Sequence, residues 1–375
     1  MHFHRLRYLI FSTIACSGGC EGFVHSEPSQ SDTQSQSATC EFSPGPPPIL
    51  RLLTRSEYRR SILALFGKDF NAGSTFPAEA IVNGFNNNAA THRATPLLVE
   101  EIAAAAQSIA QSLSTDELAT LSGCKLDPNQ PSDDDSLMMA GCREKLIDNW
   151  VPLAFRRPLT ETEREIMLEL GRRASTLDYD AQIATLIEAT LQSPQFLYRQ
   201  PSRPESPGSE SPGPNAESTK SQPLSAYALA SRLSFFLQGG PPDARLLELA
   251  ANKSLRESEV LMTEVTRLLD TPQAVDRIRE FHEQWLALDR LKDLVRDELP
   301  ADSGPVFENA LLNFLDAIFW AEEGANDLET LFTRNDLALD DELLDLYAPL
   351  IQSNGDDFSE GLGGASAQQE QARAW

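Results

Sequence analysis

The chain has 375 residues, and 56 acidic against 31 basic side chains give it a net charge of −25 at neutral pH. This acidity makes it a poor partner for phosphate backbones, so nucleic-acid binding is not expected. Apolar residues make up 41% of the chain, enough for a sizeable buried core. No apolar run reaches the length of about 18 residues that a membrane span needs, which excludes a protein with several spans.

Residues 1–20 have the pattern of an export signal. Arg5 and Arg7 supply a basic start, and Tyr8–Ala15 is a short apolar stretch. Small residues precede Cys16 and Cys20, which resembles a bacterial lipoprotein signal, where the cysteine becomes the lipidated first residue. Lipidation of Cys16 leaves an even set of four cysteines and lipidation of Cys20 leaves three, so parity favours Cys16 as the lipid anchor. Cys20, plain secretion and no export are the alternatives.

Residues 21–48 are predicted to be a flexible tether. Ser26–Ala38 is rich in Ser, Gln, Asp and Thr, and Ser43–Pro48 is rich in proline. Neither stretch offers apolar area to bury. A tether after a lipidated cysteine suits a globular body held away from a membrane.

The body of the chain carries helix signals and almost no strand alternation, so the predicted fold class is all-α. Thr54 and Glu57 form a capping box, Gly67 is a natural stop, and Pro96 suits a first helical turn. A second capping box, Thr160 with Glu163, opens a later helix. Helices are expected at 54–66, 95–113, 142–155, 160–174, 179–192, 225–237, 243–251, 258–269, 272–288, 305–323 and 328–347.

A low-complexity stretch at 200–223, rich in Pro, Ser and Glu, is predicted to be a linker between two helical halves. The first half contains helical modules at 49–124 and 142–199. The second half is one helical module at 224–350. Residues 351–375, rich in Gly, Ser and Gln, are predicted to be a disordered tail.

Several short segments occur in an order typical of one family. They are Arg51–Tyr58, Gly84–Asn87, Ala154–Thr160, Ser193–Arg199, Leu229–Leu237, Pro242–Asp243 and Phe281–Leu286. Over residues 50–350 this set resembles the multidomain proteins of planctomycetes and myxobacteria that are built from domains of unknown function numbered 1587, 1595 and 1592.

The resemblance implies a secreted or surface-linked protein without an established activity, and some relatives carry a cytochrome-c-type module. Gln238 stands where the family has tryptophan, and relatives continue beyond the position of Trp375. We therefore expect a truncated member of the family. Covalent haem attachment needs Cys-x-x-Cys-His, which does not occur in this sequence, so no cofactor is expected.

Cys124 and Cys142 are candidates for a disulfide. They are 18 positions apart on either side of a polar loop, in a chain that we expect to be exported. Such a bridge stabilises by about 3 kcal/mol in the chain-entropy model. The alternative is two buried free thiols.

The polar loops and the histidines offer little chemistry. Asn86, Asn87 and Asn88 lie in a loop and form a candidate ligand loop, whereas Asp133–Asp135 fits a solvated loop better. His282 lies beside aromatic residues on a predicted helix, where packing is a commoner role than general-base catalysis. The sequence predicts no metal site and no catalytic residue.

These features favour a lipid-anchored or secreted protein of the cell envelope that acts as a binding or scaffold module. Its partners would be the membrane, through the N-terminal lipid, and an envelope protein or glycan. The alternative is an extracytoplasmic enzyme or redox-associated component, linked to electron transfer or to polysaccharide, whose catalytic part is missing. A non-functional fragment is a third hypothesis.

Overall fold

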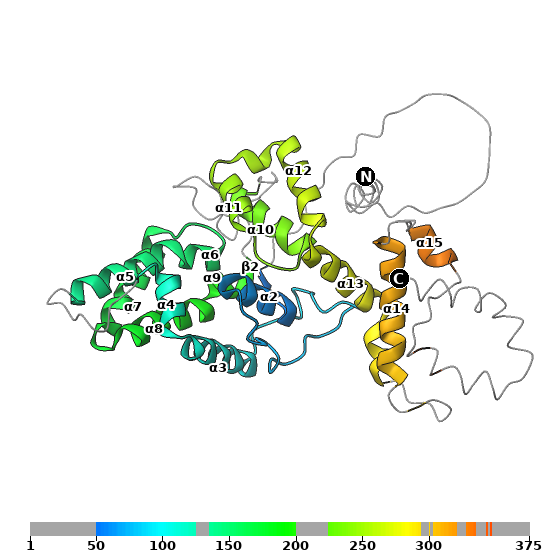
Figure 1. Ribbon diagram of the computed structural model, residues 1–375, viewed down its shortest axis with the longest axis horizontal. Coiled ribbons are helices and arrows are strands. Elements are labelled where there is room, and N and C mark those ends of the chain that lie inside the picture. Colours follow the sequence, from blue (N-terminus) through cyan, green and yellow to red (C-terminus); the bar gives the residue numbers. More distant parts are fainter. Residues whose placement is uncertain are drawn as a thin grey trace, which may run out of the picture. The chain divides into compact units, whose positions relative to one another are not determined.

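The computed structural model describes residues 50–124, 135–199, 224–293, 300, 303–320, 328–334, 343 and 346. The predicted signal, tether, linker and tail lie outside these residues. Within the described part, fourteen α-helices and one two-stranded sheet confirm the all-α prediction (Figure 1).

The first part of the described chain is a series of helices enclosed by two short strands. Its elements are β1 (Arg51–Leu52), α2 (Arg55–Phe66), α3 (Pro96–Ser112), α4 (Thr115–Ser122), α5 (Asp135–Asn149), α6 (Val151–Phe155), α7 (Glu161–Arg173), η1 (Ala174–Thr176), α8 (Tyr179–Gln192), α9 (Pro194–Leu197) and β2 (Tyr198–Arg199). The second part contains α10 (Ala226–Leu237), α11 (Ala244–Ala251), η2 (Ser254–Arg256), α12 (Ser258–Leu269), α13 (Pro272–Leu286), η3 (Leu288–Asp293), α14 (Ser303–Phe319) and α15 (Leu328–Thr333).

The predicted capping signals operate as expected. Thr54 and Glu57 form the capping box of α2, and Gly67 ends that helix in the left-handed region at φ 66°. Thr160 and Glu163 form the capping box of α7. Burial opposes ionisation of Glu163, but bonds from Arg157 and from the Thr160 main chain prevail and lower its pKa to about 2.

The single helix predicted at 142–155 is wrong in two respects. The structure begins α5 earlier, at Asp135, and ends it at Asn149, after which α6 starts afresh at Val151. The break has a cause in Pro152, which has no N–H and whose ring crowds the carbonyl four residues earlier. The helical path therefore cannot continue unbroken through Trp150.

The small sheet was not predicted. Arg51 pairs with Arg199 and Leu52 with Tyr198 in antiparallel register, and the Leu53 N–H donates to Leu197 O at 2.9 Å. Strands of two residues are too short to show alternation, so no sequence pattern marks them. Their pairing brings the start of the described chain against residues almost 150 positions away.

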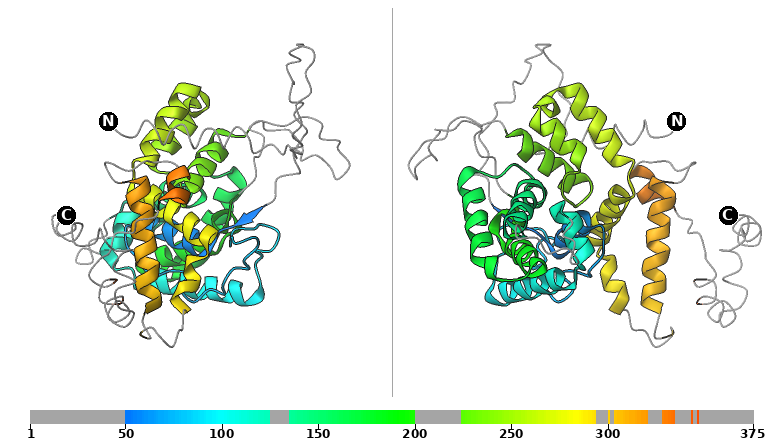
Figure 2. Two further views of the ribbon diagram at one scale, coloured as in Figure 1. Left: turned by 90° about the vertical axis from the view of Figure 1, so that its right-hand side faces the viewer. Right: turned by 60° about the vertical axis from the view of Figure 1, so that its left-hand side comes forward.

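Contacts divide the chain into two compact units, one of residues 43–277 and one that contains residues 278–375. In the first unit, α2, α3, α5, α6 and α8 bury one apolar core, which also includes Phe196 of α9 and Phe235 of α10. Helix α3 packs along α8 (Figure 2). The boundary lies inside α13, whereas the sequence places its division at 200–223.

Tyr58 is the largest fully buried side chain of the first unit's core. Its ring makes edge-to-face contacts with Phe76 and Phe196, at centroid distances of 5.0 and 5.7 Å. The hydroxyl is buried and has no hydrogen-bond partner among the described residues. Burial raises the pKa of this phenol.

In the second unit, α14 packs against η3. Arg279 forms an ion pair with Asp316, and Lys292 Nζ lies 3.0 Å from Glu308 Oε1. Helical spacing along 272–288 predicts Ile278, Phe281, Trp285 and Leu288 as a core stripe, and this prediction is partly wrong. Leu288 is buried, but Phe281 and Trp285 are 46% and 39% exposed, while His282 is 4% exposed and contacts Phe319.

Candidate functional site

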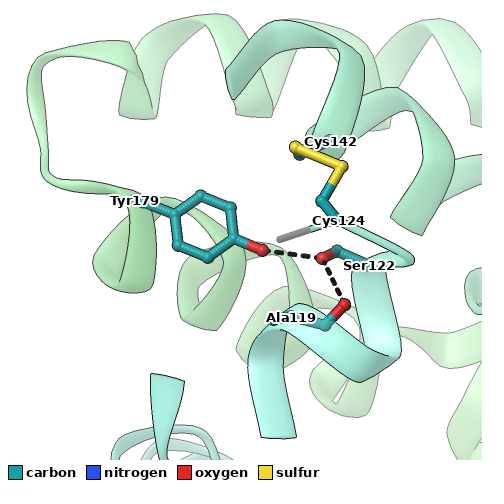
Figure 3. The surroundings of a disulfide bond; sticks show 5 residues. All are labelled: Ala119, Ser122, Cys124, Cys142 and Tyr179. Atoms are coloured by element: carbon teal, nitrogen blue, oxygen red, sulfur yellow. Dashed lines mark hydrogen bonds between the residues drawn. A yellow bond between two sulfur atoms is a disulfide. The ribbon is translucent and has the colours of Figure 1, made fainter. Parts of the chain in front are cut away.

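The predicted disulfide between Cys124 and Cys142 is present (Figure 3). Cys124 follows the glycine that ends α4, and Cys142 lies on α5; both are buried, with their Cα atoms 5.6 Å apart. Beside the bridge, the Tyr179 hydroxyl lies 2.7 Å from Ser122 Oγ, which donates to Ala119 O at 3.2 Å. Covalent and hydrogen bonds thus fix the end of α4 against α5 and α8.

The candidate ligand loop at Asn86, Asn87 and Asn88 has structural contacts. Arg51 donates from Nη2 to Asn87 O at 3.1 Å, and Asn88 Oδ1 accepts from the Ala90 N–H at 2.9 Å. The second contact is a local turn in which the side chain bonds the main chain two residues on. A ligand role for the three asparagines stays a prediction, because these contacts do not test it.

His282 is enclosed by aromatic rings. Its Nδ1 lies 2.8 Å from Ile278 O, and the rings of Phe281, Trp285 and Phe319 surround it. Burial lowers the pKa of His282, although the bond to Ile278 O opposes this effect. Among the described residues, no group of three His, Cys, Asp or Glu side chains is arranged to hold a metal ion.

Four residues from the segments that resemble the family lie close together, and one of them is the aromatic residue Phe235. We call this group the Phe235 junction; it consists of Glu57, Arg156, Arg199 and Phe235. They come from α2, the end of α6, β2 and α10, and all lie within residues 43–277. Figure 1 shows α2, β2 and α10 together at this point.

Arg156 is the buried side of the junction. Its backbone ends α6 in the left-handed region at φ 59°. The guanidinium donates to the carbonyls of Gln195, Phe196 and Tyr198 at 2.9 to 3.1 Å. It also lies 5.7 Å from the centre of the Phe235 ring. The hydrogen bonds of Arg156 therefore stabilise α9 and β2 rather than its own helix.

Arg199 lies over the same ring. Its guanidinium is 4.7 Å from the Phe235 centroid, a distance typical of a cation–π contact. Its Nη1 lies 3.1 Å from Glu57 Oε1, and the other carboxylate oxygen of Glu57 accepts from the Thr54 N–H at 3.1 Å. Glu57 therefore caps α2 and forms a buried ion pair with β2 at the same time.

Repulsion between positively charged guanidinium groups destabilises the charged form of the arginines in the junction. Burial is the largest cause that lowers the pKa of Arg156, to about 10, and the neighbouring charge of Arg199 adds to it. Burial also lowers the pKa of Arg199, and so do the charges of Arg51 and Arg277, while Glu57 opposes them. The arrangement has no nucleophile beside a base; its chemistry is that of guanidinium groups, which bind anions and carbonyl oxygens.

The sequence identifies these four segments separately and does not predict that they contact one another. Glu57 and Arg199 are 142 positions apart, and no local pattern links them. The one signal in the sequence is the residue type. An arginine at the end of a short apolar segment is rarely buried unless it is paired, so a buried Arg156 or Arg199 would need a partner.

None of the helices in the described ranges is long and apolar enough to cross a membrane. Three family models match the chain, each described as a protein of unknown function: PSD3 (DUF1587) at residues 51–115, PSD5 (DUF1595) at 142–200 and PSD4 (DUF1592) at 224–348. No curated protein and no solved structure matches it. The three domains follow one another in the order predicted from the segments around Glu57, Arg156, Arg199 and Phe235. The chain therefore carries, in this order, the three domains of unknown function PSD3, PSD5 and PSD4.

Proposed function

We propose that the protein is exported to the cell envelope, is anchored there by a lipid on its N-terminal cysteine, and acts as a binding or scaffold module. The observation that carries this proposal is the disulfide Cys124–Cys142. Structural disulfides form and persist in oxidising compartments and are rare in the bacterial cytosol. The bridge joins Cys124, which follows the range matched by PSD3, to Cys142, the first residue of the range matched by PSD5.

The shared core supports a scaffold role. The ring of Phe235, from the PSD4 range, contacts two arginines of the PSD5 range, and Glu57 of the PSD3 range binds one of them. Domains joined in this way present their surfaces in a fixed arrangement, which is what a module that holds a partner requires.

The anchor is proposed from the sequence. A lipid on Cys16, with Cys20 as the alternative, would place residues 21–48 as a tether between the membrane and the helical body. The partner would be an envelope protein or a glycan.

Mass spectrometry of protein recovered from the membranes of a bacterial lipoprotein-exporting host tests the proposal. We expect an acyl-modified N-terminal cysteine, and alkylation of Cys124 and Cys142 only after reduction. The Cys16→Ser and Cys20→Ser variants identify the anchor, because only one of them should lose the lipid. Recovery from the cytoplasm with the basic N-terminal segment intact and both thiols free would contradict it.

A further inference from the structure

The Phe235 junction continues outward into a larger group of arginines. Arg51 lies opposite Arg199 in the strand register, and Arg51 and Arg277 both act on Arg199 electrostatically. Arg60, on α2, lies with Arg277 beside Gly239. We call Arg51, Arg60, Arg156, Arg199 and Arg277 the arginine cluster; all five lie within residues 43–277.

Gly239, just after α10, marks the outer part of the cluster. A Cβ atom at this position would lie 2.5 Å from Arg60 Nη1 and 3.2 Å from Arg277 Cδ. Gly239 also has φ 65°, a conformation that other residues rarely adopt. The absence of a side chain therefore lets two arginines approach the main chain at one point.

Arg51, Arg156 and Arg199 carry more positive charge than their one acidic partner neutralises. In the described part of the chain, Glu57 is the one carboxylate bonded to Arg51, Arg156 or Arg199. The remaining partners of these three guanidiniums are carbonyl oxygens and the Phe235 ring, which carry no net charge. Three positive charges thus share one negative charge.

This local excess contrasts with the rest of the molecule. The chain as a whole has a net charge of −25, yet Arg51, Arg156 and Arg199 have one bonded carboxylate, that of Glu57, between them. Solvent reaches the outer part of the cluster, since Arg51, Arg60 and Arg277 are half-buried while Arg156 is buried. An anion from solution can therefore contact the outer guanidiniums without opening the core.

We propose that Arg51, Arg199 and Arg277 form a binding site for a sulfate or phosphate group. Guanidinium forks bind tetrahedral oxyanions through paired, charge-assisted hydrogen bonds. The group is either a free ion or a substituent on a larger molecule such as a sulfated glycan. The inference rests on the proposed binding role and names the chemistry that it recognises.

Calorimetric titration of the purified, disulfide-bonded full chain tests the site. The probes are sodium sulfate, sodium phosphate and a sulfated oligosaccharide, each added at constant ionic strength in chloride buffer. We expect saturable binding of at least one probe. If the inorganic ions bind as tightly as the oligosaccharide, the ligand is the anionic group itself. If the oligosaccharide binds much more tightly, the ligand is a glycan.

Two variants locate the site. Arg51→Gln and Arg277→Gln should each weaken binding by about tenfold or more, because each removes a charged donor. Arg172→Gln, on the exposed face of α7, is the matched control and should bind like the unaltered chain. Circular dichroism checks folding, and Arg51→Lys, which keeps the charge but not the fork, should bind with intermediate affinity.

No saturable binding of any probe by the unaltered chain would overturn the inference, and so would unchanged affinity in both glutamine variants. Failure of this titration leaves export untouched, because the membrane mass measurement tests export on its own. Recovery of the protein from the cytoplasm would contradict the proposed export but would not contradict the proposed anion site.

Discussion

Replacing Glu57 by glutamine tests whether the Phe235 junction holds the domains together. Glutamine has nearly the same size, and its amide oxygen can still accept from the Thr54 N–H, so the cap of α2 is largely kept. The change removes the negative charge that faces Arg199, whose side chain is 13% exposed. The perturbation is therefore confined to the ion pair.

The expected effect follows from burial of the pair. Removing one partner of a buried ion pair typically lowers the free energy of unfolding by about 3–5 kcal/mol, because the other charge is left uncompensated. Here the positive charges of Arg51 and Arg277 add to the penalty at Arg199. For a folded body of about 150–250 residues, each kcal/mol shifts the melting midpoint by about 2–4 °C. We expect the midpoint to fall by roughly 6–20 °C.

Urea denaturation followed by circular dichroism measures the change. Glu117→Gln is the matched control, because Glu117 occupies the same capping-box position in α4 but its side chain is 40% exposed. Its carboxylate accepts from the Ser114 N–H and lies 3.5 Å from Lys68 Nζ at the surface. The double variant Glu57→Gln with Arg199→Gln should lose less than the sum of the two single losses, since both charges leave together. If Glu57→Gln is as mild as Glu117→Gln, the junction is not a stabilising ion pair and the reasoning fails.

Four further predictions concern other parts of the molecule. Replacing Cys124 and Cys142 by serine should lower the free energy of unfolding by about 3 kcal/mol, measured by urea denaturation; no loss would contradict the loop-closure argument. Because the pKa of Glu163 is about 2 when folded and 4.5 when unfolded, its stabilisation is complete above pH 4.5 and is lost toward pH 2. Glu163→Gln should therefore flatten the acid limb of a stability–pH profile, and an unchanged limb would refute this. Burial keeps His282 neutral while the unfolded chain takes up a proton near pH 6.5, so stability should fall as pH drops below 6.5, and His282→Gln should remove that slope. Tyr58→Phe removes a buried hydroxyl without a described partner and should leave the melting midpoint unchanged or raise it; a clear fall would reveal a missed hydrogen bond.

The helix ends that the sequence predicts correctly are those marked by local signals. Thr54, Thr160 and Gly67 mark helix ends through bonds made within four residues, so their meaning does not depend on the rest of the fold. The helix predicted at 179–192 matches α8 at both ends, because Asp178 caps it and its apolar spacing is regular.

The face of α13 shows where periodicity misleads. Apolar spacing favoured Phe281 and Trp285 as core residues, but the structure buries His282 between them. Periodicity identifies an apolar face without saying which element packs on it. Here the ion pair of Arg279 with Asp316 and the contact of His282 with Phe319 decide which side of α13 faces α14.

The Phe235 junction was beyond sequence reasoning for a different reason. Its members come from four elements, and each looks locally like a helix end or a core residue. Arg156 illustrates this, because its position after α6 suggested a role at that helix, while its hydrogen bonds go to carbonyls about 40 positions later. Only the tertiary fold shows that these segments form one structure.

The junction also shows how the three matched domains depend on one another. The ranges matched by PSD3, PSD5 and PSD4 do not coincide with compact units, because residues 43–277 form one unit and the PSD4 range continues beyond it. Phe235 needs the arginines of the PSD5 range to cover its ring, and Arg199 needs Glu57 of the PSD3 range to balance its charge. Cutting the chain between matched ranges would expose an aromatic ring on one piece and leave buried arginines without their partners on the other. The three domains are therefore expected to fold together, and binding experiments on a single isolated domain would test a different structure.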